Sequence, residues 1–163
     1  MRIRALTTLL VFVLLAGVGV AQANTSHVGW PAIDGALAIN KLDQNRELHG
    51  IPGRHNELLG GHGSDRIYGR DAGDVIWGDY KPCCQPATQV DRLYGAGGRD
   101  FIYASHGKSY IWAGAGNDVV HAHFGHGEIH CGSGRDVAFL SHRSRPHWRL
   151  YGCERISYFT RGY

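Results

Sequence analysis

The sequence predicts an all-β protein in which short strands stack into a solenoid, and three observations support this. Acidic or amide residues recur at nine-residue intervals over much of the stretch from Asn56 to Asp136. An aliphatic residue follows two positions after most of them, so two residue classes keep one period. Beyond Gly50 no segment keeps the apolar stripe of an amphipathic helix, and glycine makes up 24 of 163 residues, roughly twice its usual share. A nine-residue period of this kind is typical of stacked β-coils.

The clearest copy of the repeat is the segment from Gly60 to Tyr68, GGHGSDRIY, which fits the pattern G-G-x-G-x-D-x-U-x with a large aliphatic residue at U. Glycines permit a tight turn, the aspartate offers a carboxylate to a hard cation, and the aliphatic side chain points into a thin core. On these residues the chain resembles the hemolysin-type (RTX) calcium-binding nonapeptide-repeat family, and in particular its small secreted bacterial members. The resemblance implies a right-handed parallel β-roll (β-solenoid), with two nonapeptides in each coil and Ca²⁺ as the cofactor.

The repeat divides the chain into four parts. We expect a signal peptide at 1–23, an N-terminal cap at 24–55, an RTX-like β-roll at 56–139 and a C-terminal cap at 140–163. Caps are expected because one repeat cannot bury its single aliphatic residue and the open ends of a stack need cover. The sixth positions, where the pattern has its aspartate, are Asn56, Asp65, Asp74, Asp91, Asp100, Ser109, Asp118, Gly127 and Asp136. The eighth positions are Leu58, Ile67, Ile76, Leu93, Ile102, Ile111, Val120, Ile129 and Ala138.

The period is interrupted once, between Asp74 and Asp91, where two steps are one residue short. We interpret residues 79–89, which contain two prolines, as an irregular loop that replaces one half-coil. Alternate repeats then share a side of the roll. One side is expected to carry Asp65, Asp100, Asp118 and Asp136, and the other Asn56, Asp74, Asp91, Ser109 and Gly127.

The resemblance places calcium ions between neighbouring turns on the same side of the roll. It implies one ion between the turns that end at Asp100 and Asp118, and another between those that end at Asp118 and Asp136. Backbone carbonyls are expected to complete these sites, from Gly97, Gly98, Gly114, Gly116, Gly132 and Gly134. A third site is expected from Asp74 and Asp91, with an imperfect turn before Asp74. Asp65 has an intact turn, but the 79–89 loop is expected to remove its partner. The alternative is a roll without ions, in which aspartate and glycine only shape the turns.

Four cysteines in an exported chain favour disulfides over a zinc site. Cys131 opens an intact turn, and Ile156 lies 18 residues after Ala138, which predicts a further degenerate turn that contains Cys153. The two cysteines then lie on neighbouring coils, whose spacing suits a disulfide. Cys83 and Cys84 remain, either as a vicinal disulfide or as two free thiols, with intermolecular pairing as the less favoured alternative.

The ninth positions point outward and are rich in aromatic residues. One face is expected to present Trp77, Tyr94, Trp112 and His130, and the other Tyr68, Tyr103, His121 and Phe139. The simpler interpretation is cross-strand stacking or cover by the caps. The alternative is that Trp77, Tyr94 and Trp112 contact an extracellular glycan or protein partner, which would make the chain an adhesion module with structural calcium.

The N-terminus has the features of a signal peptide. Arg2 and Arg4 precede the apolar run from Leu9 to Val20, and an A-x-A site follows, so cleavage is expected after Ala23 and the mature chain is expected to be secreted and extracellular. A membrane anchor is the alternative, but the run is short for spanning a bilayer and no second candidate follows. Removal of Arg2 and Arg4 with the signal peptide lowers the formal net charge from +3 to +1. A charge this small does not indicate a nucleic-acid-binding surface.

Two catalytic motifs that accompany such repeats are missing from the sequence. There is no H-E-x-x-H motif of a zinc protease and no G-x-S-x-G elbow of a lipase. No other constellation of carboxylates or nucleophiles stands out, so the sequence predicts a non-enzymatic calcium-binding protein.

Overall fold

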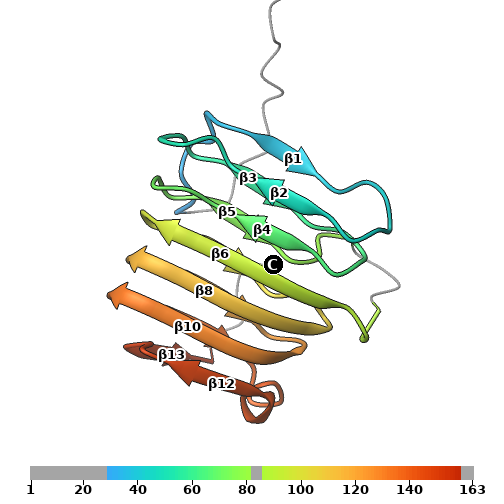
Figure 1. Ribbon diagram of the computed structural model, residues 1–163. Helices are drawn as coiled ribbons and strands as arrows, with labels where there is room; N and C mark the ends of the chain where they lie inside the picture. The colour runs from blue at the N-terminus through green and yellow to red at the C-terminus, as the bar shows by residue number, and fades with distance from the viewer. Residues whose placement is uncertain (1–28, 82–85, 159–163) are drawn as a thin grey trace, which may run out of the picture.

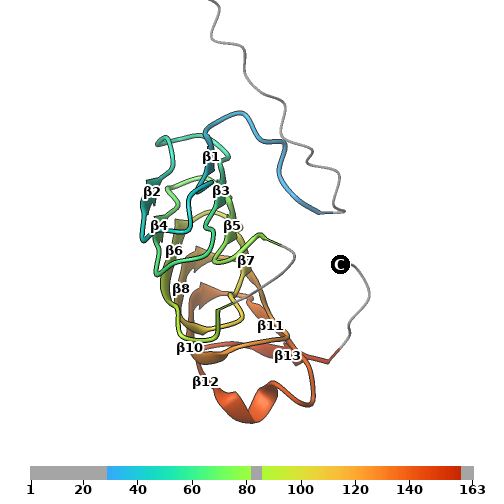
Figure 2. The ribbon, with the colours of Figure 1, turned by 90° about the vertical axis from the view of Figure 1, so that its right-hand side faces the viewer.

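The computed structural model describes residues 29–81 and 86–158, and these form two facing parallel β-sheets (Figures 1 and 2). The chain passes from one sheet to the other after nearly every strand, so that each sheet collects alternate strands. The odd sheet has the order β1 (Leu37–Ile39), β3 (Glu57–Leu59), β5 (Val75–Trp77), β7 (Phe101–Tyr103), β9 (Val119–Ala122), β11 (Val137–Leu140), β13 (Arg155–Ser157). The even sheet has the order β2 (Glu47–His49), β4 (Arg66–Tyr68), β6 (Val90–Gly97), β8 (Lys108–Gly116), β10 (His126–Gly134), β12 (Trp148–Tyr151). The predicted all-β parallel β-roll is confirmed.

The core between the sheets is a double row of aliphatic side chains. All nine predicted eighth-position residues have no exposed surface and pack in one cluster. Each lies opposite its equivalent on the next coil, as Leu58 does with Ile76 and Ile67 with Leu93. A single apolar residue per strand therefore suffices, because every coil covers its neighbour.

The sheets extend beyond residues 56–139 at both ends. The strands β1 and β2 precede this range, and β12 and β13 follow it, in register with the roll. The segments expected as caps thus supply the end strands. A short 3₁₀ helix, η1 (Arg145–His147), connects β11 to β12. Within 29–81 and 86–158, no helix has the length and apolar character needed to cross a membrane.

The irregular segment lengthens one connection and does not replace a half-coil. Asp74 precedes β5, which pairs with β7, whereas Asp65 precedes β4, which pairs with β6. The predicted sides were therefore wrong before residue 79: Asn56 and Asp74 share a side with Asp100, and Asp65 shares the other side with Asp91. One step plus an eight-residue insertion is nearly as long as two steps, so the period alone did not distinguish them.

The predicted disulfide between Cys131 and Cys153 is confirmed, with a Cα–Cα distance of 5.1 Å. This distance is close to the spacing of neighbouring coils, which explains why the bond fits. Cys83 and Cys84 lie outside the described residues, as does the predicted signal peptide.

The ninth-position rings form two stacked rows. Because the repeats before residue 79 lie on the other side from the predicted one, Trp77 and Tyr68 change places between these rows. The odd-sheet row is Trp77, Tyr103, His121 and Phe139, with ring planes within 8° of parallel. The even-sheet row is His49, Tyr68, Tyr94, Trp112, His130 and Tyr151. Trp77 and Tyr68 were thus each predicted on the wrong face, while cross-strand stacking itself is confirmed.

Candidate metal centre

Turns join the two sheets along two edges of the roll. We call the edge where the chain passes from the even to the odd sheet the acidic edge, because its turns end at Asn56, Asp74, Asp100, Asp118, Asp136 and Glu154. The other edge, which we call the opposite edge, has turns that end at Asp65, Asp91, Ser109 and Gly127. The acidic edge therefore keeps carboxylates on five successive coils, while the opposite edge has lost them by its third repeat.

Hydrogen bonds connect the sixth positions of the acidic edge into a continuous row. The backbone N–H of each residue donates to one carboxylate oxygen of the residue on the next coil, over 2.7 to 2.9 Å from Asn56 to Asp136. The row ends at Glu154, whose Oε2 accepts from the Asp136 N–H at 2.7 Å. The sequence predicted a turn at Glu154 but not its part in this row. A glutamate 18 residues after Asp136 was the available signal.

In two turns that precede the insertion, residues 60–65 and 69–74, the second carboxylate oxygen is satisfied by the protein; we call them the early turns. The Asp74 Oδ2 accepts from the Arg70 N–H at 2.7 Å, and the Asp65 Oδ2 accepts from the Gly61 N–H at 3.0 Å. Asp65 also accepts from the side-chain amide of Asn40. These carboxylates close their own turns and need no ion.

In the turns that follow the insertion on the acidic edge, the second oxygen has no protein donor. We call residues 95–100, 113–118 and 131–136 the late turns. The Oδ2 atoms of Asp100, Asp118 and Asp136 are buried and accept no hydrogen bond, and the same is true of Asp91 on the opposite edge. A buried carboxylate oxygen without a partner is costly, so this position calls for a proton or a cation.

The electrostatics of the late turns support the same conclusion. Burial, reinforced by the charges of Asp118 and Asp74, raises the pKa of Asp100 to about 9. Burial and the neighbouring Asp136 raise the pKa of Asp118 to about 6. The pKa of Asp136 is also raised, chiefly by burial and also by Glu154. Stacked carboxylates disfavour one another's charge, and a divalent cation between them removes that penalty.

The backbone of the late turns explains why no N–H reaches these oxygens. The second and fourth residues of each turn have positive φ: 78° and 93° at Ala96 and Gly98, 113° and 150° at Gly114 and Gly116, 103° and 141° at Gly132 and Gly134. In this conformation strand pairing continues into the turn, with Gly114 opposite both Ala96 and Gly132. The donors are engaged between coils, and the carboxylate is left open.

The late turns are also packed too closely for side chains. A Cβ on Gly116 would overlap the carbonyl oxygen of Gly98, and one on Gly134 would overlap that of Gly116. The same Cβ on Gly116 would lie 3.2 Å from the Asp118 Oδ1. The carbonyl oxygen of Gly98 therefore lies near the Asp118 carboxylate. A groove of about 590 Å³, lined in part by Asp118, Asp136 and Glu154, runs beside the last two late turns.

The donor set fits calcium. No three His, Cys, Asp or Glu side chains converge as a metal cluster in the described parts of the chain, so side chains of these types alone do not complete a site. Carboxylate and carbonyl oxygens are the ligands of a hard cation, and calcium takes six to eight of them. Asp100, Asp118 and Asp136 with the late-turn glycines are brought together as the sequence predicted. Asp74 and Asp91 are not, because they lie on different edges.

Comparison with known families identifies the repeat. Four copies of the RTX calcium-binding nonapeptide repeat match the chain, over residues 53–79 and 94–129. These segments are RTX calcium-binding repeats. The matched RTX repeats flank the insertion, and the row of carboxylates continues past them to Asp136 and Glu154. Searches of curated proteins and of solved structures found no match.

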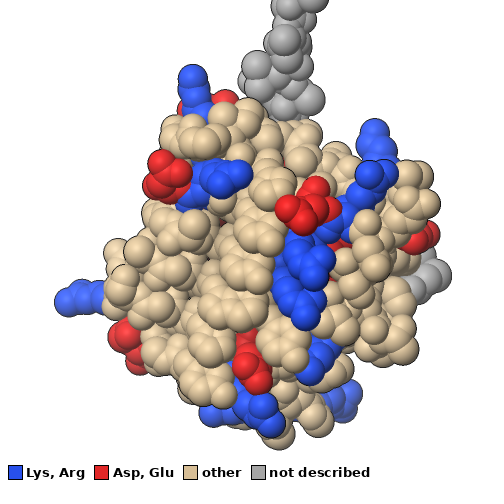
Figure 3. Space-filling model, in the orientation of Figure 1, with Lys and Arg blue, Asp and Glu red and all other residues tan. Residues whose placement is uncertain are grey.

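The aromatic rows differ from a sugar-binding platform. In the even-sheet row, Tyr94 has parallel neighbours on both faces, Tyr68 and Trp112, with centroids 4.8 Å away. Trp77 of the odd-sheet row stacks on Tyr103, and Trp30 packs at a steep angle beside both rings. Sugar rings stack on open aromatic faces, whereas these rings present mainly their edges. The even-sheet face also carries scattered charges of both signs (Figure 3).

Proposed function

We propose that this protein is a secreted, non-enzymatic calcium-binding β-roll whose ions lie between the late turns of the acidic edge. One ion belongs between the turns of Asp100 and Asp118 and a second between those of Asp118 and Asp136. Bound there, calcium neutralises neighbouring carboxylates and ties successive coils together.

The observation that carries this proposal is the row of buried carboxylate oxygens without donors. It is confined, on the acidic edge, to the turns in which positive φ recurs at the second and fourth positions. The RTX repeats over 53–79 and 94–129 support the choice of ion.

The test is a calorimetric calcium titration of the mature chain, followed in parallel by circular dichroism. We expect at least two ions to bind with a gain in ordered β-structure. Asp118→Asn alters a residue shared by both sites and is expected to abolish or strongly weaken both. Asp71→Asn removes an exposed carboxylate from an early turn and serves as the control of equal charge. Wild-type protein that binds no calcium would exclude the proposal.

Export is supported by the charged, apolar and small-residue segments at the N-terminus. Mass spectrometry of the protein recovered from culture medium is expected to show a chain that begins at Asn24. A cell-associated chain that retains residues 1–23 would contradict export by cleavage.

A further inference from the structure

The eight-residue insertion builds a second kind of polar centre, on the opposite edge of the roll. Asp79 is the second residue of the enlarged turn, and Asp91, at the end of it, is equivalent to the sixth residue of a regular turn. In the regular turn before it, the second-position N–H of Gly61 lies 3.0 Å from the Asp65 Oδ2. In the enlarged turn, burial and then the charges of Asp65 and Asp79 raise the pKa of Asp91, which places the Asp79 carboxylate near that of Asp91.

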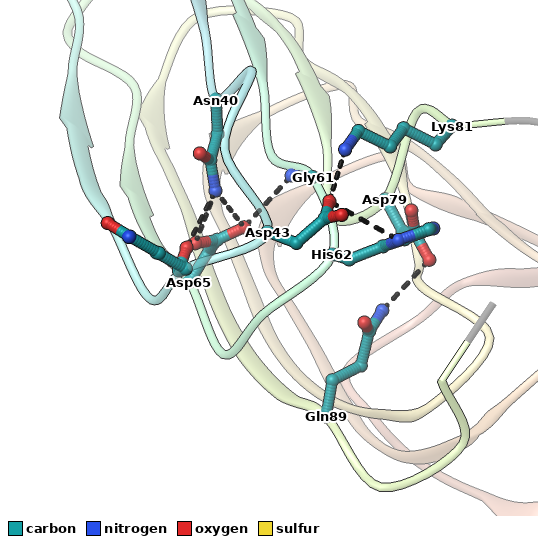
Figure 4. Close-up of polar contacts among 9 residues, drawn as sticks. Asn40, Asp43, Gly61, His62, Asp65, Asp79, Lys81 and Gln89 are labelled. Carbon is teal, nitrogen blue, oxygen red and sulfur yellow. Dashed lines mark hydrogen bonds and ion pairs between the residues drawn. The ribbon is translucent and has the colours of Figure 1, made fainter. Parts of the chain in front are cut away.

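A third side chain joins these two. The Gln89 Nε2 donates to the Asp79 Oδ2 at 2.9 Å (Figure 4). Asp79, Gln89 and Asp91 are only 6%, 4% and 0% exposed. Gln89 directly precedes β6 and lies two residues before Asp91, and both side chains are buried in the turn.

By hydrogen-bond geometry, each of the three side chains has one buried oxygen without a partner: the Asp79 Oδ1, the Gln89 Oε1 and the Asp91 Oδ2. The Ser105 hydroxyl lies near the Asp91 carboxylate and the Lys81 N–H near that of Asp79, but neither satisfies these oxygens. The nearby ammonium group of Lys81 pairs with Asp43, as Figure 4 shows. One water supplies only two protons to three acceptor oxygens, whereas a divalent cation among them would neutralise both carboxylates. Two carboxylates and an amide oxygen balance a divalent hard cation.

We infer that Asp79, Gln89 and Asp91 form a calcium site created by the insertion and independent of the acidic-edge sites. Two of its three ligands, Gln89 and Asp91, lie outside the matched repeats, so the site is not one that the repeats alone supply. Because its third ligand is the Gln89 amide, the site has only two carboxylates.

Native mass spectrometry in calcium tests this directly by counting bound ions. Asp79→Asn keeps an acceptor for the Gln89 amide but removes the charge, and we expect it to bind one ion fewer than wild type. Asp71→Asn, the exposed control, is expected to match wild type. If Asp79→Asn binds as many ions as wild type, the inferred site does not exist, while the acidic-edge sites remain counted in the same spectra.

A second variant covers the case in which Asp79→Asn folds poorly. Gln89→Glu adds a third carboxylate, so the rise in Tm caused by calcium is expected to exceed that of wild type. A water-filled pocket predicts instead that Gln89→Glu lowers Tm equally with calcium and with chelator, and that result would overturn the inference. Wild-type protein without any bound calcium would overturn both this site and the proposed function.

Discussion

The early turns and the late turns all end in an aspartate at the sixth position and use its carboxylate in opposite ways. In the early turns, Asp65 and Asp74 accept N–H donors with both oxygens. In the late turns, one oxygen of each aspartate accepts from an N–H on the preceding coil, and the other oxygen is buried without a donor. In the N-terminal coils, protein donors therefore satisfy both carboxylate oxygens. The carboxylates of the C-terminal coils of the acidic edge instead require an added positive charge. The conformation of the turn, rather than the presence of aspartate, decides which.

The largest expected difference between the two regions follows removal of calcium. Each site saturated at about 100 times its Kd contributes roughly 2.7 kcal/mol, so two sites contribute about 5 kcal/mol. Hydrogen exchange with chelator is expected to show lost protection in β7 to β11 and retained protection in β3 and β5. Uniform loss along the whole roll would show that early and late turns do not differ in their need for ions.

Substitution of a late-turn glycine is expected to be the next largest effect. Gly116→Ala places a Cβ against the Gly98 carbonyl at a φ of 150°, and overpacking with strain should cost about 3 kcal/mol or more. Gly53→Ala is the control, because Gly53 has a φ of 68° with no atom within 4 Å of the added Cβ. It should cost only about 1 kcal/mol. Equal losses in urea denaturation would show that close packing of the late turns is unimportant.

Neutralising one aspartate in each region sharpens the comparison. Asp118→Asn is expected to reduce the calcium-dependent stabilisation by about 3 kcal/mol or more, since two sites share this residue. Asp65→Asn places an amide NH₂ group against a backbone N–H donor. It should lower the free energy of unfolding by roughly 1 to 3 kcal/mol, equally with and without calcium. Thermal melts of both variants with calcium and with chelator separate the two cases. A calcium-dependent loss in Asp65→Asn would count against a self-sufficient early turn.

The pH dependence of the ion-free protein follows from the raised carboxyl pKa values. The folded state holds protons on Asp118 up to about pH 6 and on Asp100 up to about pH 9, whereas the unfolded chain releases them near 3.8. Stability is therefore greatest at low pH and is lost as the pH rises through this window. Between pH 6 and pH 8 the loss from Asp100 and Asp118 should be roughly 3 kcal/mol, and Asp91, whose pKa burial raises to about 7, should add about 1 kcal/mol. Melts in chelator measure it, and saturating calcium should abolish it; a rise in stability with pH would contradict it.

The smallest expected effect concerns Ala96, which has a φ of 78° and is the one non-glycine residue with positive φ among those that the structure describes. Ala96→Gly relieves the left-handed strain but frees the unfolded chain, for a net gain of about 0.5 kcal/mol. Urea denaturation of this variant checks it. A net loss would mean that the methyl group makes a favourable contact in this turn.

Much of the roll was predictable from residue spacing. The core positions from Leu58 to Ala138, the stacked coils and the Cys131–Cys153 bond all follow from a period that the backbone must repeat. Late-turn residues Asp100, Asp118 and Asp136 were predicted together for the same reason. Glu154 was missed because a longer side chain at the sixth position departs from the pattern.

By itself, the sequence determined the nine-residue period, the all-β solenoid and the residues inside it, because a repeating backbone must place equivalent side chains at equivalent points. Only the tertiary structure decided which repeats share an edge, since an insertion of eight residues and a half-coil of nine differ by one residue in length. It also decided which carboxylates need an ion. That outcome depends on whether an N–H group of the turn reaches the second oxygen, and hence on backbone angles and neighbouring coils that residue identity alone does not specify.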